Sequence, residues 1–197
     1  MTGITVARIL RALEGYYRAN AEELGAFLRT HPAEGDARET LLVREEAGAV
    51  ELALVLPDRL ARSAWKSLTL DERCQVVEGA SHFLVVCERA RSDRPTTHLE
   101  LELQAEVDKW LVLSGGGRLD QEADAELRAA LYHRGTFLHP AHTVEGQRYR
   151  FANDLAARFT YKIARSHARL GRFDKMRDEL HQFFRMGQEE KIRAIAA

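Results

Sequence analysis

Apolar residues recur at helical spacing near the start of the chain. Val6, Leu10 and Leu13 share one face of a helix that would lie within residues 1 to 20, and the spacing continues through Leu24 and Leu28. Arg8, Arg11, Glu14 and Arg18 interrupt the apolar residues, so the segment is amphipathic and lacks the continuous apolar core of a signal peptide. The pattern predicts one or two N-terminal helices that end near His31-Pro32.

The pattern then changes to two short runs that are typical of β-strands. These are TLLVRE, beginning at Thr40, and VELALVLP, ending at Pro57, with Gly48 available for a tight turn between them. A hairpin alone is marginally stable in water, so this one must pack on helices or pair with another strand, including a strand of a second subunit. An edge strand as apolar as VELALVL needs cover, and we therefore expect self-association through the hairpin edge or through helices that are apolar on two faces.

The rest of the chain is predicted to be helical. Thr69 followed by Glu72 is a capping-box signature that starts a long helix over residues 71 to 90. In residues 97 to 113 the apolar residues alternate with polar ones, as in a strand, but some of them also recur at helical spacing. The Glu, Gln, Ala and Lys content favours the helix. Further helices are expected over the ranges 120 to 132, 145 to 170 and 173 to 186, with a short tail helix from Gln188.

These elements predict a mainly α (α+β) fold, which is a helical single domain over residues 1 to 197 with a β-hairpin inserted near residues 40 to 56. A composition of 45% hydrophobic and 30% charged residues is typical of one globular domain. No apolar run reaches the 18 or so residues of a membrane span, and we expect a cytoplasmic protein. Cys74 and Cys87 lie too far apart along one helix to form a disulfide.

The near-zero net charge of -1 conceals two regions of opposite sign. Residues 1 to 144 hold 17 basic and 23 acidic side chains, whereas residues 145 to 197 hold 12 basic and 7 acidic ones. In the basic region Arg158, Lys162, Arg165 and Arg169 form one stripe along the predicted helix, and we call these four residues the basic stripe. The stripe is predicted to be solvated or to pair with the acidic region of the same chain or of a second copy. The alternative is that it binds an acidic protein partner, with nucleic acid as the less favoured ligand.

A second pattern concerns metal binding. Glu78 and His82 lie one turn apart on the helix over residues 71 to 90, and Glu102 and Glu106 repeat the spacing on the next helix. If the two helices pair, these side chains could hold a divalent metal, as in carboxylate sites of helical bundles. Those sites use a repeated Glu-x-x-His spacing that is absent here, so surface pairs are the alternative interpretation.

Two further groups of residues are candidates for sites. His133, His139 and His142 fall in one irregular segment and could gather on zinc, although no fourth ligand is predictable and exposure is the simpler interpretation. The run Ser114-Gly-Gly-Gly117 follows no strand and precedes no GK[ST], so it predicts a loop rather than a phosphate-binding turn.

The sequence therefore favours a non-enzymatic cytosolic interaction module that uses the basic face of a C-terminal helix and requires no cofactor. The alternative is a hydrolase-like, metal-dependent enzyme that uses Glu78, His82, Glu102 and Glu106.

Overall fold

A computed structural model describes residues 4–20, 24–32, 38–46 and 49–196. The chain divides into two compact units, Met1–Pro95 and Thr96–Ala197, and each is described by itself. The predicted mainly helical α+β fold is confirmed. The prediction of one domain over the whole chain stays a prediction, and the change of charge sign near residue 144 falls inside the second unit rather than between the units.

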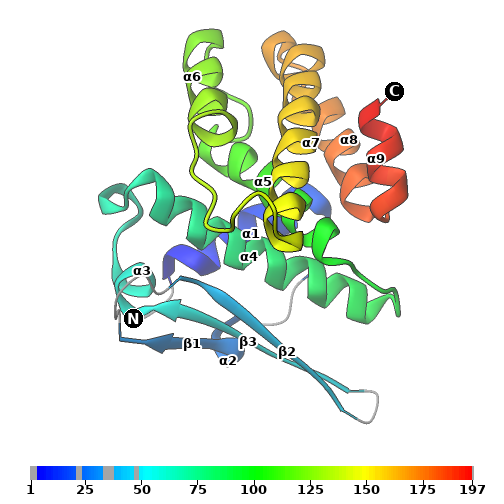
Figure 1. Cartoon of the computed structure of the whole chain (residues 1–197). Helices are drawn as coiled ribbons and strands as arrows, with labels where there is room; N and C mark the ends of the chain where they lie inside the picture. The colour runs from blue at the N-terminus through cyan, green and yellow to red at the C-terminus, as the bar shows by residue number, and fades with distance from the viewer. Residues whose placement is uncertain (1–3, 21–23, 33–37, 47–48, 197) are drawn as a thin grey trace. The chain divides into compact units, whose positions relative to one another are not determined.

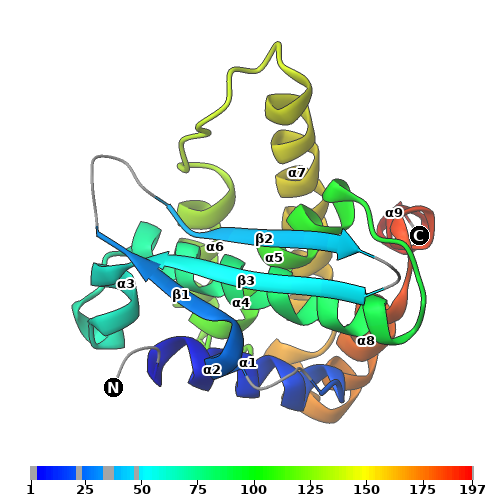
Figure 2. The ribbon, with the colours of Figure 1, turned by 90° about the horizontal axis from the view of Figure 1, so that it is seen from below.

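The N-terminal unit combines helices with a small mixed sheet (Figures 1 and 2). Its elements in chain order are α1 (Ile4–Tyr17), α2 (Leu24–Phe27), β1 (Leu28–His31), β2 (Thr40–Glu46), β3 (Ala49–Pro57), α3 (Asp58–Arg62), the 3-10 turn η1 (Trp65–Ser67) and α4 (Leu70–Arg91). The strand order is β1-β3-β2, with β1 parallel and β2 antiparallel to β3. The predicted hairpin is confirmed, whereas its turn at Gly48 lies outside the described residues.

Two expectations about this sheet are wrong. Residues 28 to 31 form β1 rather than the end of a helix, because Leu28 pairs with Leu54 and the segment completes a parallel ladder with β3. The run VELALVL is the central strand rather than an edge, because β1 and β2 lie on either side of it. The exposed edge of the hairpin is therefore β2.

The core of this unit lies between the sheet, α4 and α1. Leu54 and Leu56 of β3 are buried, as are Val76 and Phe83 of α4. Gly79 allows α4 to approach the sheet closely, because a Cβ at this position would lie 2.9 Å from Leu54 Cδ1. Helix α4 begins where predicted, with the Thr69 side chain accepting from the Glu72 backbone and the Glu72 carboxylate accepting from the Thr69 backbone.

The regular elements of the C-terminal unit are all helices among its described residues (Figure 1). It contains α5 (His98–Leu113), α6 (Gln121–Tyr132), α7 (Val144–Ser166), the 3-10 turn η2 (Ala168–Leu170), α8 (Phe173–Arg185) and α9 (Gln188–Ala196). Residues 97 to 113 are therefore a helix, and Thr97 with Glu100 forms a second capping box at its start. Helix α5 packs along α7, and Trp110 and Phe159 are fully buried in this core.

The loop after α5 closes on itself, as its glycines predict. Gly115, Gly116 and Gly117 all adopt the left-handed backbone conformation, with φ of 62°, 77° and 72°. Their amides bond to Val112 O, Leu111 O and Ser114 Oγ respectively. Since these donors are used within the loop, it does not form a phosphate cradle.

Candidate interaction surface

Helix α7 carries Arg158, Lys162 and Arg165 of the basic stripe and owes its position to capping and packing. The helix predicted over residues 145 to 170 ends at Ser166, because the backbone leaves the helical conformation at His167, so Arg169 lies in η2. The Thr143 side chain accepts from the Gly146 amide and caps the helix start. On one face Phe159 and Ile163 are buried, and the Phe159 ring stacks on Phe183 of α8 with centroids 3.9 Å apart. The opposite face is solvent-exposed and contains Arg158, Lys162 and Arg165.

Two of the four cations of the basic stripe interact with other parts of the C-terminal unit. The Lys162 ammonium lies 3.3 Å from the Ala194 carbonyl oxygen and 4.0 Å from Glu179 Oε1. Glu179 also contacts His167 Nε2, at 2.6 Å. Arg169 Nη2 lies 3.6 Å from Asp124 Oδ2, and its side chain is only 26% exposed. The predicted pairing of the stripe with the acidic region, residues 1 to 144, therefore holds for Arg169, whereas Glu179, the carboxylate near Lys162, belongs to the basic region.

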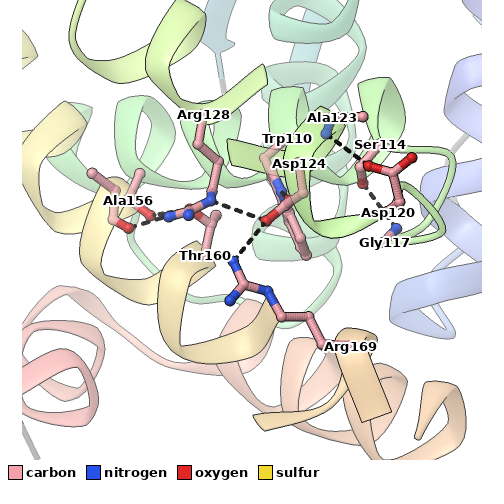
Figure 3. Close-up of polar contacts among 11 residues, drawn as sticks. Trp110, Ser114, Gly117, Asp120, Ala123, Asp124, Arg128, Ala156, Thr160 and Arg169 are labelled. Atoms are coloured by element: carbon pink, nitrogen blue, oxygen red, sulfur yellow. Dashed lines mark hydrogen bonds and ion pairs between the residues drawn. The ribbon is translucent and has the colours of Figure 1, made fainter. Parts of the chain in front are cut away.

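Asp124 is the centre of a buried polar cluster (Figure 3). Its carboxylate accepts a 2.8 Å hydrogen bond from Trp110 Nε1 and a 3.2 Å bond from Arg128 Nε, in addition to the Arg169 ion pair. The cluster joins α5, α6 and η2. Asp124 also lies in the first turn of α6, where a negative charge interacts favourably with the helix dipole.

Arg158 and Arg165 differ from their neighbours on the stripe. Both are exposed, and no described residue forms an ion pair or a hydrogen bond with either guanidinium group. They lie seven residues apart, which is about 10.5 Å along the helix and nearly the same direction around it. The fold thus leaves two cations of the stripe uncompensated on one surface.

Two exposed aromatic residues accompany these cations on α7. Phe151 is 46% exposed and lies two turns before Arg158, on the same face. Tyr161 is 44% exposed, and the Arg128 guanidinium lies 4.9 Å from its ring centroid. We use the name α7 face for Phe151, Arg158, Tyr161, Lys162 and Arg165. Arginine and aromatic side chains are the types that contribute most to protein–protein interfaces.

The residues of the predicted metal site belong to different units. Glu78 and His82 are half-buried one turn apart on α4 of the N-terminal unit, whereas Glu102 is buried on α5 of the C-terminal unit. Glu106, one turn further along α5, accepts a 2.7 Å hydrogen bond from the Lys109 ammonium. A metal site formed jointly by residues of α4 and α5 therefore stays a prediction.

The other candidate residues do not form sites. Among the residues that the structure describes, His133, His139 and His142 do not converge into a metal-binding group, and each is exposed. The His139 ring instead stacks on Tyr149 at 5.3 Å. Cys74 and Cys87 are free thiols, as their spacing predicts.

Sequence reasoning missed the Asp124 cluster and the buried hydroxyl of Tyr132. A buried tryptophan needs an acceptor for its indole N–H, so the position of Trp110 within an apolar stripe was the available signal. Tyr132 donates a 2.9 Å hydrogen bond to the Glu106 carbonyl oxygen. Burial raises the pKa of the Tyr132 hydroxyl well above its ordinary value.

Comparison of the chain with known protein families, with curated proteins and with solved structures finds no match. None of the described helices has the length and apolar content that a bilayer crossing requires.

Proposed function

We propose that this protein is a non-enzymatic interaction module whose α7 face binds an acidic segment of a partner protein. The observation that carries the proposal is the exposure of Arg158 and Arg165 without ion-pair partners among the described residues. An exposed cation that lacks an intrachain partner can pair with a carboxylate of a second molecule without first breaking a contact. The two guanidinium groups then fix the direction of the bound segment along α7.

The residues of the α7 face favour a protein rather than a nucleic acid as its binding partner. Phe151 and Tyr161 offer apolar area beside the cations, which suits a segment that mixes carboxylates with apolar side chains. Nucleic-acid binding draws most of its free energy from many cations that each neutralise a phosphate. Here Asp154 is exposed one turn before Arg158, and the whole C-terminal unit carries 16 basic and 15 acidic residues. That balance is better suited to a few specific ion pairs.

A cytoplasmic location forms part of the proposal. The support is that Cys74 and Cys87 are both free thiols, which is usual in a reducing compartment.

The experiment measures binding of a defined set of fluorescent peptides to the full chain and to the variant R158E/R165E. The peptides contain two glutamates seven residues apart with leucines between them, and control peptides have glutamine in place of glutamate. We expect only the acidic peptides to bind, less tightly as salt rises. Loss of two exposed ion pairs of about 0.7 kcal/mol each predicts about tenfold weaker binding by the variant.

The matched control is R172E/K175E, which makes the same change of charge at two exposed cations without ion-pair or hydrogen-bond partners among the described residues. It should bind like the unaltered chain. Equal weakening by both double variants would show that net charge, not the α7 face, causes binding. Tighter binding of a single-stranded oligonucleotide than of any peptide would refute the proposed class of partner.

A further inference from the structure

The first half of the outer edge of β2 lacks the features that usually protect an edge strand, whereas its second half, Arg44 to Glu46, is charged. Among the described residues only β3 pairs with this strand, so its other edge presents unpaired backbone groups. Natural edge strands are kept from pairing by shortness, by proline or by charged side chains. Strand β2 has seven residues, and its first half, Thr40 to Val43, contains neither a charge nor a proline.

Apolar side chains of β2 are exposed on both faces of the sheet. Leu42 is 55% exposed and Val43 is 48% exposed. Leu41 and Val43 are paired with Leu54 and Leu52 of β3. They therefore lie on the face that α4 covers at Leu54, because residues paired across a ladder point to the same side. Leu42 points to the opposite face.

We infer that β2 pairs antiparallel with β2 of a second copy of this chain, about a two-fold axis that passes through the Leu42 pair. In this register Leu42 lies opposite Leu42, Leu41 opposite Val43, and Thr40 opposite Arg44 of the second copy. Every exposed apolar residue of the strand thereby meets an apolar residue. The sheets of the two copies join into one six-stranded sheet, with the apolar layer on its α4 side continued across the junction.

Other registers of the same symmetry fit the side chains less well. A two-fold axis perpendicular to the sheet keeps every side chain on its original face of the sheet. Residues opposite each other must also point to the same face. The axis therefore has to pass through a residue that is paired with the same residue of the second copy. Pairing centred on Val43 places Leu42 opposite Arg44, and pairing centred on Arg44 places two guanidinium groups opposite each other. Arg44 already forms an ion pair with Glu51 of β3, at 2.5 Å, so the Leu42 register leaves its charge compensated.

The first measurement is sedimentation of the full chain from micromolar to 100 micromolar concentration. We expect twice the 22.3 kDa mass of one chain at the upper end. L42E should weaken the dimer at least tenfold, because it places two carboxylates opposite each other at the axis. L138E changes an equally apolar residue that is 67% exposed in the other unit and should leave the dimer intact. A monomer at 100 micromolar, or a dimer that L42E leaves unchanged, would overturn the inference.

Cysteine cross-linking in a C74S background then tests the register. Opposed residues of an antiparallel pair have Cα atoms about 4.5–5.5 Å apart, within disulfide reach, so L42C should form a covalent dimer under mild oxidation. T40C alone should not, because its own copy lies about 13 Å away along the strand. A mixture of T40C and R44C should cross-link between the two variants. Cross-linking of T40C alone, or none by L42C, would contradict the register.

Discussion

Replacement of Asp124 by alanine is expected to destabilise the C-terminal unit by about 3–5 kcal/mol. The Trp110 indole N–H is fully buried and would lose its acceptor, which costs about 1–3 kcal/mol. Arg128, whose side chain is 14% exposed, would remain without its carboxylate, and breaking a buried ion pair costs about 3–5 kcal/mol in total. The Arg169 pair adds less than about 1 kcal/mol, because that side chain reaches solvent more easily.

The assay is urea unfolding followed by tryptophan fluorescence in a Trp65→Phe background. Trp65 and Trp110 are the two tryptophans of the chain, so the remaining signal reports on the C-terminal unit. Asp124→Asn should cost less than the alanine variant, about 1–2 kcal/mol, because the amide oxygen can still accept from Trp110.

Asp120→Ala is the matched control for this prediction. Asp120 belongs to the same helix and accepts a 2.9 Å hydrogen bond from the Ala123 amide, but it is exposed, so loss of this cap should cost about 1 kcal/mol. If Asp124→Ala costs no more than Asp120→Ala, the cluster does not hold the three helical segments together. A double-mutant cycle between Trp110→Phe and Asp124→Ala, followed by far-ultraviolet circular dichroism because Trp110→Phe removes the fluorescent reporter, should give a coupling energy above about 1 kcal/mol.

Three further predictions concern the loop after α5, Tyr132 and metal binding. Gly117→Ala should lower the free energy of unfolding by about 2–3 kcal/mol, because its Cβ would lie 3.0 Å from Ala168 at a positive φ. Gly115→Ala has the same backbone strain in open space and should cost about 1 kcal/mol in the same urea titration. Because burial raises the folded-state pKa of Tyr132, its contribution to stability is complete below the unfolded pKa of about 10 and is lost as pH rises further. The thermal midpoint between pH 9 and 11 should therefore fall more steeply in the unaltered chain than in Tyr132→Phe. If the metal site predicted from the sequence exists, elemental analysis of the purified chain should find stoichiometric zinc, iron or manganese that is lost in His82→Ala.

Local signals predicted the helices well because their causes are local. The capping boxes at Thr69 and Thr97 each need only a residue three positions later, and both are present in the structure. The Glu, Gln, Ala and Lys content of residues 97 to 113 is also a local signal, and it correctly favoured a helix despite the alternating leucines. Strand β1 was missed because nothing local defines it. Leu28 continues the helical spacing of Leu24, and the strand exists through parallel pairing with residues 54 to 57, which are distant in sequence.

The candidate interaction surface was likewise predictable from the sequence only where its causes are local. Spacing alone placed Arg158, Lys162, Arg165 and Arg169 on one face of a helix, which the structure confirms for the first three, whereas Arg169 lies beyond the helix end at Ser166, in η2. The spacing of residues in the sequence could not show that Asp124 forms an ion pair with Arg169, because that pair spans 45 positions and depends on how α6 and η2 pack. Nor could it show that the edge of the hairpin is TLLVREE rather than VELALVL, because the order of strands depends on β1.

Some cations of the basic stripe are paired and others are not, so substitutions at its different positions should have different effects. Arg169 takes part in a buried cluster, so a change there should alter stability and binding together. Arg158 and Arg165 have no partner in the described chain, so changes there should alter binding while the free energy of unfolding stays within about 0.5 kcal/mol. Cations retained only for solubility would act through net charge, and their positions around the helix would not matter. Dependence of binding on these two positions, at constant net charge, is therefore what distinguishes a recognition face from a solvated one.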